Sequence, residues 1–264
     1  VDKLRARTAA GLKADGTLIL YTVDESSVSA GLTLPLLAER MSKLGCVTAI
    51  NLDGGGSTAA GVVYPGYSTG ATVNSPSDGK LRGCANFIFL TRAATTAGQP
   101  QRLHLYPLSG TNVLPGARVA LTAKASDANY QATDLPGDVT YSTNGGVVES
   151  GVLNVSSAAR AGTLTVSAAS GALQTSTTYT VLNDVSAITV QKADAKSALT
   201  ALRCAGGSST ALKASATWSG MEVLAQSISF TWAVSDGLGT VSADGVFTAA
   251  DVSKPTDGTL TVSY

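Results

Sequence analysis

The feature that most constrains this chain is the loss of any sustained helical period after about residue 93. Beyond that point the sequence consists of short runs rich in Thr, Val and Ser, separated by Asn-Gly, Asp-Gly and Pro-Gly pairs. Short alternating runs between such turns are typical of strands in β-sandwiches. Aromatic residues make up only 5% of the chain, and the abundant Val and Thr also favour strands. We therefore expect the last two thirds of the chain to be all-β.

An internal repeat divides this β-rich part. Residues 139–169 align with residues 230–264, and each stretch has a strand with an aromatic residue, an Ala-rich corner and a GTLTVS strand. The repeat predicts two modules of one kind, at 99–183 and 184–264. They are similar to bacterial immunoglobulin-like domains of cell-surface proteins, so we expect two all-β immunoglobulin-like sandwiches and an extracellular or cell-surface location.

The second module differs from the first at its end. The first continues past GTLTVS into a further strand, whereas the second stops at Tyr264. We therefore expect the chain to be cut inside its third domain. A sandwich without its last strand would leave an unpaired edge, which is an aggregation risk.

Residues 1–95 follow a different pattern, which is α/β. Two apolar runs, at 17–24 and 47–52, are predicted strands, and the run at 86–91 is predicted to be a buried strand that closes the segment. Between the first two, residues 33–45 carry apolar side chains at helical spacing. The whole chain is thus expected to be multi-domain, with a partial α/β (α+β) domain followed by two β-sandwiches.

The ends of the predicted helix have physical causes. Thr33 can accept hydrogen bonds as the N-cap, and Pro35 is suited to the first turn. Gly45 follows the last apolar position and can adopt the left-handed conformation that ends a helix.

The charge balance excludes some classes of partner. Lys plus Arg and Asp plus Glu number 18 each, so no summed field attracts nucleic acid or an anionic membrane surface. No apolar run reaches the length of about 18 residues that a membrane span needs. The first residues contain no apolar targeting segment, so any targeting signal is expected outside this sequence.

Cysteine and histidine content argues against a metal centre. The three cysteines, Cys46, Cys84 and Cys204, are too few and scattered for a disulfide framework, although Cys46 and Cys84 could pair if their strands are neighbours. His104 is the single histidine, and the alternation around it predicts a strand side chain. We expect no metal and no cofactor.

The strongest candidate for chemistry is the loop at residues 53–57, DGGGS, which directly follows a predicted strand. Three glycines can let successive backbone N–H groups turn inward as a nest for an anion such as phosphate. The alternative is a simple turn, for which glycine is the usual residue. The loop is not a P-loop because it lacks the lysine, and Ser57 has no histidine nearby in sequence to activate it as a nucleophile.

Three stretches, 7–25, 31–58 and 74–90, follow in order the motifs of the phosphodiester glycosidase family, which this segment resembles. The resemblance covers about a third of the chain and implies hydrolysis of a sugar-1-phosphodiester, such as a GlcNAc-1-phosphodiester. It corresponds to the C-terminal half of the family's domain. We therefore expect the intact parent to be a hydrolase acting on glycosyl bonds, and this fragment to be inactive without its N-terminal half or another chain that completes it.

The resemblance also places the family's functional positions on this sequence. The catalytic candidates are Arg7, Asn51 and Asp53, and the substrate- or phosphate-binding candidates are Thr8, Gly54, Gly55, Gly56, Ser57, Asn74 and Arg82. Either arginine could grip the phosphate in a bidentate fork while the glycine nest supplies further donors. Asp53 could stabilise the oxocarbenium-like sugar, act as nucleophile or base, or only orient the loop. Taken singly, each residue also has a structural interpretation, as a surface charge, a turn former or a loop cap.

Two other functions compete with hydrolysis. In the first, the chain is a non-catalytic surface scaffold whose glycosidase-like segment binds a phosphorylated glycan. In the second, Trp218 and Trp232 form a sugar-binding platform on the β modules, although a tryptophan in a sandwich strand more often belongs to the core.

Overall fold

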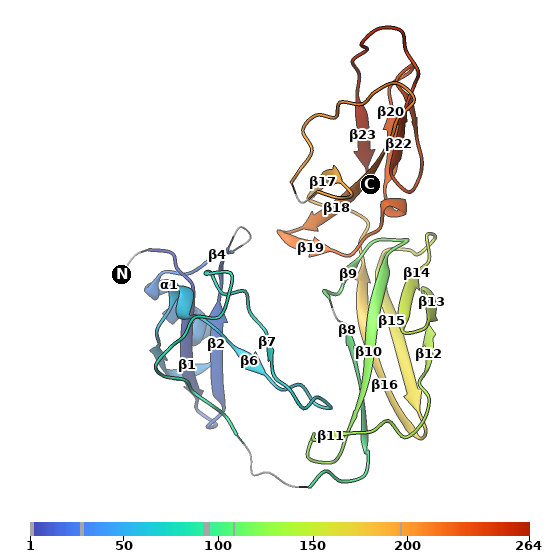
Figure 1. The fold of residues 1–264 in the computed structure, drawn as a ribbon. Helices are drawn as coiled ribbons and strands as arrows, with labels where there is room; N and C mark the ends of the chain where they lie inside the picture. Colours follow the sequence, from blue (N-terminus) through green and yellow to red (C-terminus); the bar gives the residue numbers. More distant parts are fainter. Residues whose placement is uncertain (1–2, 27–28, 92–95, 108, 196) are drawn as a thin grey trace. The chain divides into compact units, whose positions relative to one another are not determined.

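The computed structural model describes residues 3–26, 29–91, 96–107, 109–195 and 197–264. Most of the described secondary structure is β-strand, arranged in several separate sheets, as the sequence predicts (Figure 1). The chain divides into two compact units, Val1–Ala97 and Gly98–Tyr264. The candidate site residues of the sequence all lie in the first unit.

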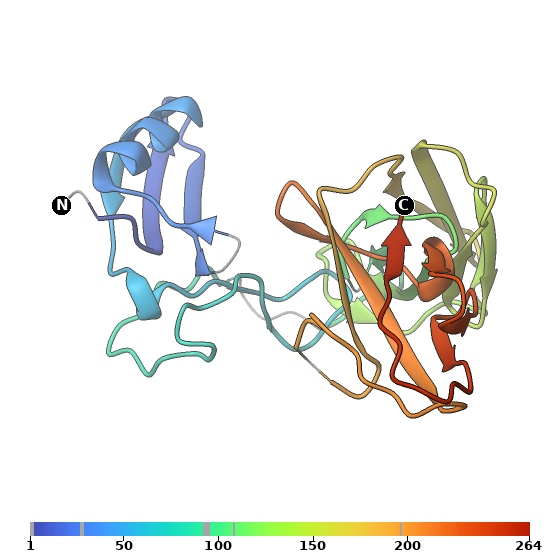
Figure 2. The ribbon, with the colours of Figure 1, turned by 90° about the horizontal axis from the view of Figure 1, so that it is seen from above.

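The first unit is built on a small antiparallel sheet with one helix against it (Figure 2). The strand order is β2-β1-β5, and α1 packs on one face through Leu37 and Met41, which bury Ala9 between helix and sheet. Gly11 allows this close packing, because a Cβ there would lie 2.7 Å from the terminal methyl of Met41. The elements of this unit are β1 (Arg7–Lys13), β2 (Leu18–Val23), β3 (Glu25–Ser26), β4 (Ser29–Ala30), α1 (Leu34–Lys43), β5 (Cys46–Asn51), the 3-10 turn η1 (Gly55–Ser57), β6 (Gly61–Val62) and β7 (Ala71–Thr72).

The predicted helix is confirmed together with its caps. The side chain of Thr33 accepts a hydrogen bond from the Leu36 amide at 3.3 Å, and Pro35 lies in the first turn. Gly45 has φ +87°, which supplies the left-handed residue directly after the C-cap. Strand β1 was not foreseen as a strand, although it is the central strand of the sheet.

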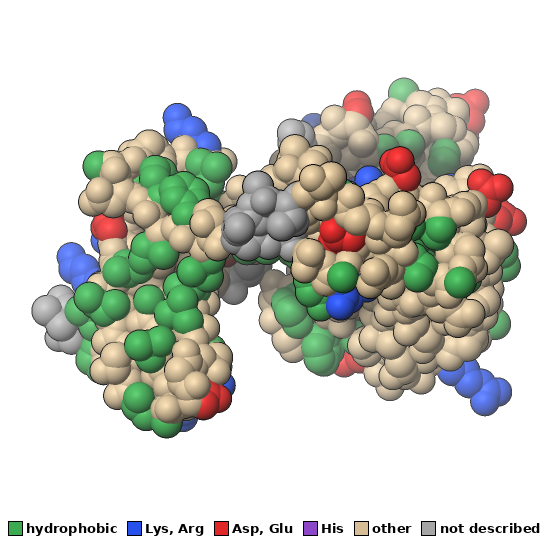
Figure 3. Space-filling view, turned by 90° about the horizontal axis from the view of Figure 1, so that it is seen from below, with side chains coloured by type: hydrophobic (Ala, Val, Ile, Leu, Met, Phe, Trp, Pro, Cys, Tyr) green, Lys and Arg blue, Asp and Glu red, His purple; other side chains and the backbone are tan. Residues whose placement is uncertain are grey.

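The predicted buried strand at 86–91 is wrong. These residues form no strand, and four adjacent apolar side chains are exposed, with Phe87 at 63% and Phe89 at 76%. A strand needs a neighbour for its backbone groups, and the described chain supplies none for this segment. The edge strand β5 is exposed in the same way, with Val47 at 71% and Ile50 at 62%, and Figure 3 shows many apolar side chains on the surface of this unit.

The second unit begins with two sheets that enclose a core. One sheet has the order β11-β10-β14-β13 with β8 also paired to β10, and the other has the order β12-β15-β16-β9. Side chains from both sheets meet in one buried cluster that includes Leu121, Leu164 and Tyr179. The strands are β8 (Arg102–Pro107), β9 (Asn112–Val113), β10 (Arg118–Ser126), β11 (Ala132–Thr133), β12 (Thr140–Thr143), β13 (Gly146–Glu149), β14 (Val152–Val155), β15 (Gly162–Ser170) and β16 (Leu173–Val181).

The remaining strands of this unit form a second pair of sheets around a smaller core. One sheet has the order β17-β18-β22-β21 with β19 also paired to β18, and the other contains only β20 and β23. The core includes Ala214, Val223 and Phe230. The elements are β17 (Ala187–Lys192), β18 (Ser209–Trp218), β19 (Met221–Val223), η2 (Ser227–Ser229), β20 (Thr231–Val234), β21 (Gly239–Val241), β22 (Val246–Ala249) and β23 (Leu260–Ser263).

The two tryptophans have different environments. Trp232 packs against the core of the second sheet pair, and its indole N–H donates to the Ser227 carbonyl at 2.9 Å. Trp218 ends β18 beside a tight turn and is 37% exposed. Trp232 thus packs against the core, which is the environment that the sequence favours for a tryptophan in a sandwich strand.

Candidate functional site

The DGGGS loop leaves the sheet at the end of β5, and at each of its three glycines a side chain would meet strain or a close neighbour. A Cβ on Gly54 would lie 2.6 Å from the carbonyl oxygen of Ala6. Gly55 has φ +60°, where other residues are strained. Gly56 is buried, and a Cβ there would collide with the side chains of Asp78 and Arg82. The three glycines therefore let the loop fold back against β1 and let an ion pair rest directly on it.

The backbone amides of the loop are mostly used within the protein. The Gly54 amide donates to its neighbour Asp53 Oδ1 at 2.8 Å, the Gly55 amide to the Ala6 carbonyl at 2.8 Å, and the Ser57 amide to the Gly54 carbonyl at 3.3 Å. The predicted phosphate nest of inward-facing amides is therefore wrong for these three residues. Because the loop turns tightly, its backbone amides lie within hydrogen-bond distance of oxygen atoms of the protein itself.

A cavity of about 550 Å³ nevertheless opens beside this loop. Its charged residues come from three separate segments, namely Arg5 before β1, Glu25 in β3, and Asp78 and Arg82 in the loop after β7. The full lining is Arg5, Glu25, Ser26, Gly54, Gly55, Gly56, Ser77, Asp78 and Arg82. The site thus presents two guanidinium groups and two carboxylates around the glycine loop.

Arg82 is held over the loop by two partners. Its Nε and NH2 donate to the two oxygens of Asp78 at 2.8 and 3.1 Å, and NH1 lies 3.5 Å from the Ser57 hydroxyl. Both members of the ion pair are partly exposed. Ion pairs in contact with solvent contribute little net free energy, so an anionic ligand can compete for the guanidinium N–H groups.

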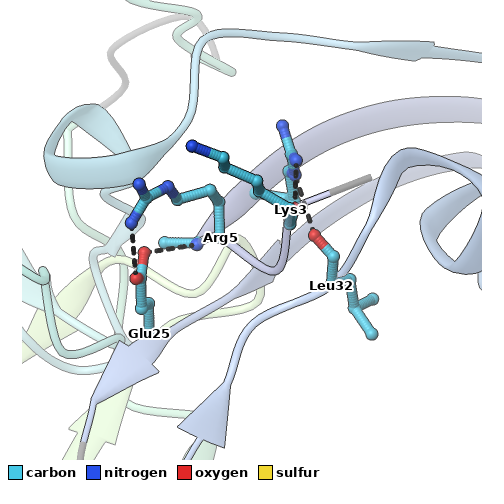
Figure 4. Close-up of polar contacts among 6 residues, drawn as sticks. Lys3, Arg5, Glu25 and Leu32 are labelled. Atoms are coloured by element: carbon cyan, nitrogen blue, oxygen red, sulfur yellow. Dashed lines mark hydrogen bonds and ion pairs between the residues drawn. The ribbon is translucent and has the colours of Figure 1, made fainter. Parts of the chain in front are cut away.

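Arg5 lies on another part of the cavity lining and has a similar arrangement. Its NH1 donates to Glu25 Oε1 at 3.0 Å, while the amide of Ala6 donates to Glu25 Oε2 at 3.2 Å (Figure 4). Glu25 therefore fixes both the side chain of Arg5 and the start of β1. A guanidinium has five N–H donors, and this contact uses only one of them.

Arg7 does not line this cavity. Its Nε donates to the carbonyl of Leu32 at 3.0 Å and its NH2 to the carbonyl of Lys3 at 2.9 Å. The backbone carbonyls of Lys3 and Leu32, two residues labelled in Figure 4, thus hold the guanidinium between two chain segments.

The other predicted residues at the strand ends also lie outside the lining of the cavity. Asn51 ends β5 and is exposed, and Asp53 is exposed with Oδ1 accepting from the Gly54 amide. Thr8 donates from its hydroxyl to that of the fully buried Thr58 at 3.3 Å. These side chains therefore surround the glycine loop without sharing one pocket.

Asn74 fastens the segment that follows the loop. Its Oδ1 accepts from the Ala60 amide at 2.8 Å, and its Nδ2 donates to the Thr58 carbonyl at 3.0 Å and to Asp24 Oδ1 at 2.8 Å. The second oxygen of Asp24 accepts from the Ser75 amide at 2.8 Å. Asn74 thus links three chain segments by hydrogen bonds and does not line the cavity.

Sequence reasoning missed Arg5, Glu25 and Asp78 as cavity residues. The spacing of Asp78 and Arg82, four residues apart, indicates a local ion pair. Nothing in the sequence pairs Arg5 with Glu25, because they are brought together by the sheet and by the bridge between Arg5 and Leu32.

The described residues give no indication of a metal centre or of a helix that could serve as a membrane span. No group of three or more His, Cys, Asp or Glu among them could hold a metal ion. No helix in the described ranges has the length and apolar character needed to cross a bilayer. All three cysteines are free thiols, so Cys46 and Cys84 are not paired.

Comparison with known proteins identifies the first segment. Residues 2–91 match the family model described as phosphodiester glycosidase. The chain is similar to mouse (Mus musculus) N-acetylglucosamine-1-phosphodiester alpha-N-acetylglucosaminidase, with 46% identity over 57 residues, which are 22% of this chain and 11% of that protein. It is also similar to the SPbeta prophage-derived uncharacterized protein YomE of Bacillus subtilis (strain 168), with 39% identity over 86 residues, covering 32% and 12% of the two chains.

The chain thus spans only about a tenth of the length of these relatives. A solved structure, domains 5–6 of the S-layer protein SbsC, aligns with 62% of this chain and 91% of its own, at 18% identity and a TM-score of 0.30. The resemblance to the phosphodiester glycosidase family that the sequence motifs indicate is confirmed by the family match. Residues 2–91 of this chain are therefore a segment of the phosphodiester glycosidase family.

Proposed function

We propose that the protein to which this segment belongs is a hydrolase that cleaves a sugar-1-phosphodiester, and that the cavity beside the glycine loop binds the phosphate. The observation that supports this most is that Arg5 and Arg82 line one cavity together with the three glycines of the loop. Guanidinium groups bind phosphate oxygens in bidentate geometry, so two of them suit a phosphodiester.

The chemistry of the substrate explains what such a cavity has to do. Hydrolysis adds water at the anomeric carbon and breaks its bond to the phosphate oxygen, which leaves as a phosphomonoester. The leaving group is stabilised as an anion and needs charge stabilisation more than protonation. Arg82, which Asp78 and Ser57 position, would supply that stabilisation as charge develops on the departing oxygen.

Three roles are open for Asp53. It could be a nucleophile, a base, or a residue that only shapes the loop through the Gly54 amide. Its exposed side chain lies outside the cavity lining, so we propose the loop-shaping role for this chain. We also propose a structural role for Arg7 and Asn74, because their side chains hydrogen-bond to the backbone of neighbouring segments.

We also propose that a second polypeptide segment, either the N-terminal half of the domain or another chain, completes the glycosidase domain. The chain alone would then hydrolyse nothing, and the two parts together are called the completed domain below. The exposed edge of β5 and the exposed apolar side chains of Phe87 and Phe89 support this, because such surfaces are normally covered. Residues 1–95 would be the partial enzyme domain. The modules at 99–183 and 184–264 would be immunoglobulin-like spacers of an extracellular or cell-surface protein.

The test is an assay of N-acetylglucosamine release from a GlcNAc-1-phosphodiester by the completed domain. We expect Arg82→Gln to lower kcat/KM by about 100-fold or more, and Arg82→Lys to recover only part of it, because lysine lacks the fork. Arg40→Gln, on the exposed face of α1, is the matched control. Equal rates for Arg82→Gln and the unchanged protein would refute the proposed phosphate site.

A second candidate is a non-catalytic scaffold that binds a phosphorylated glycan. It is favoured by one observation, that both cavity arginines are already paired with carboxylates while Asp53 lies outside the cavity. Calorimetric binding of a GlcNAc-1-phosphodiester to the completed domain, with loss of binding in Arg82→Gln and no turnover over days, would support this candidate against hydrolysis.

A further inference from the structure

Strand β8 carries a row of ring side chains on the outer face of the first sheet pair. Leu103 and Leu105 belong to the core, whereas the alternate residues are only partly buried, namely Arg102, His104 and Tyr106. The rings of His104 and Tyr106 are stacked, with their centroids 6.1 Å apart. The alternation of this strand therefore brings two rings and a guanidinium to one surface.

Tyr130 joins this row from the turn at residues 127–131, which connects β10 to β11. Its ring centroid lies 6.4 Å from that of His104, and the guanidinium carbon of Arg102 lies 4.3 Å from the centre of the Tyr130 ring. Tyr130 is nevertheless 52% exposed, although Arg102 covers one face of its ring. Arg102, His104, Tyr106 and Tyr130 are called the aromatic cluster below.

The backbone of Tyr130 has a conformation that is unusual for a large residue. Its φ of +63° lies in the left-handed region, which bulky side chains rarely occupy. The carboxylate of the buried Asp127 stabilises this turn, because its Oδ1 accepts from the amides of residues 129 and 131 at 2.8 and 2.9 Å. Its Oδ2 accepts from the Gly98 amide at 3.0 Å. Residues that are held in such strained positions cluster at ligand-binding sites.

Arg102 is oriented by the same turn. Its NH1 donates to the backbone carbonyl of Asp127 at 3.1 Å and to that of Ala128 at 2.5 Å. A guanidinium has five N–H donors, and these two contacts use only the NH1 group. The N–H groups of Nε and NH2 are therefore able to bind an anion in a bidentate fork.

A second cation lies on the same face. Lys124 is the register partner of His104 on β10, and side chains of directly opposed residues lie on one side of a sheet. The carboxylate of Asp127 is turned away from this surface, since the residue is only 3% exposed and its oxygens accept from three backbone amides. An anionic ligand would thus meet Arg102 and Lys124 beside the rings.

We propose that the aromatic cluster and Lys124 bind an acidic polysaccharide whose sugar rings carry carboxylates. The apolar face of a pyranose packs well on a tyrosine ring, and the tyrosine hydroxyl can hydrogen-bond to sugar hydroxyls. Because Arg102 lies directly against the Tyr130 ring, the anion has to be attached close to the sugar ring, as the carboxylate of a uronic acid is. A nucleic acid strand fits less well, because two cations supply few of the phosphate contacts that determine its affinity.

The experiment titrates the whole chain with oligogalacturonate, which has a carboxylate on every sugar ring, and measures binding by calorimetry. We expect saturable binding that weakens as salt is added, because the cations are partly exposed. Dextran oligosaccharides of the same length have no charge, and polyglutamate has no sugar rings. Each should bind at least about tenfold more weakly, because each lacks one of the two kinds of contact.

Tyr130→Gly removes the ring without unfolding the turn. Glycine adopts the positive φ of this position readily, so the urea midpoint should change little. The affinity for oligogalacturonate should fall about tenfold, because the stacking surface is lost. The matched control is Ser150→Gly, since Ser150 is also exposed and also has a positive φ, of +48°. It should leave the affinity unchanged. Arg102→Lys should weaken binding, because lysine keeps the charge but lacks the fork.

Four results would overturn the proposal. The first is no saturable binding of oligogalacturonate at millimolar concentration, on the order of the weakest specific affinities. The second is an unchanged affinity in Tyr130→Gly. The third is equal binding of polyglutamate or of dextran, which would show that charge or sugar rings alone suffice. The fourth is tighter binding of oligothymidylate than of oligogalacturonate, which would assign the surface to single-stranded nucleic acid.

Discussion

At the scale of single residues, the candidate site depends on what surrounds each glycine more than on the glycines themselves. Gly56 is the clearest case, since the ion pair of Asp78 and Arg82 occupies the space where a side chain would begin. The same ion pair supplies the cavity with its best-positioned guanidinium. The absence of a side chain at Gly56 therefore leaves room for the ion pair and for the position of Arg82 in the cavity lining.

This gives a first prediction. Gly56→Ala should displace the Asp78–Arg82 ion pair and weaken phosphodiester binding, with a loss of stability of about 1 kcal/mol or less, because the added methyl occupies the place of two side-chain ends that are free to move. Denaturant unfolding and ligand titration measure the two effects. Gly83→Ala is the control, because a Cβ at Gly83 meets nothing within 4 Å and should leave both quantities unchanged. Unaltered binding in Gly56→Ala would show that the ion pair is not needed.

A second prediction concerns Tyr179. Its hydroxyl is buried and has no hydrogen-bond partner among the described residues, and burial raises its pKa to about 12. Tyr179→Phe should therefore stabilise the second unit by about 1–2 kcal/mol. Tyr264→Phe is the matched control and should be destabilising, because the Tyr264 hydroxyl donates to the Leu182 carbonyl at 2.6 Å.

The pH dependence of Tyr179 has a definite sign. A folded pKa above the unfolded value of about 10 means that the unfolded chain releases its proton first. The unchanged protein should thus lose stability, relative to Tyr179→Phe, as the pH rises from about 10 toward 12. A constant difference between the two proteins across this range would contradict the assigned burial.

At the scale of elements, strand β8 contains a histidine that links the strand to its neighbour. His104 Nε2 lies 2.8 Å from the hydroxyl of the buried Ser126, and Lys124 is its register partner on β10. Burial lowers the pKa of His104, and the charge of Arg102 lowers it further. The neutral ring is therefore the form that this strand pair accommodates.

A third prediction follows for acid. Because the folded pKa lies below the ordinary value of 6.5, the unfolded chain binds the proton first as pH falls. The contribution of His104 to the urea midpoint of the second unit should be constant above about pH 6.5 and should decline below that pH. Urea titrations at a series of pH values should show this decline reduced in His104→Gln, and an identical decline in both proteins would refute it.

The elements also show what could be predicted from sequence and why. Helix α1 was predicted with both ends because Thr33 and Gly45 act locally. Residues 86–91 were misassigned because an apolar run becomes a strand only if a neighbour exists, which is a tertiary condition. Likewise the glycine loop was recognised, but its amides were misjudged, since the Ala6 carbonyl that binds one of them lies far away in sequence.

At the scale of the whole molecule, the two units differ in how much core supports them. The first unit buries few apolar side chains, chiefly Ala9, Leu37 and Met41, whereas the second contains two larger clusters. Hydrophobic burial is the main favourable contribution to folding, so the first unit should be the weaker one.

A fourth prediction follows. Thermal unfolding should show at least two transitions, with the first unit melting earlier. Leu37→Ala should lower only the first transition, by about 2–5 kcal/mol in stability, and Leu153→Ala, in the buried core of the second unit, should lower only a later one. A single transition shifted by both substitutions would indicate one cooperative block.

The cavity beside the glycine loop has a further consequence for how fast a ligand would arrive. Its two guanidinium groups are balanced by two carboxylates, and the chain as a whole carries a formal net charge of +0. Neither the cavity lining nor the chain therefore carries a formal net charge that would attract a phosphodiester from a distance. Encounter should therefore proceed by unassisted diffusion, with an association rate that changes little between low and physiological ionic strength.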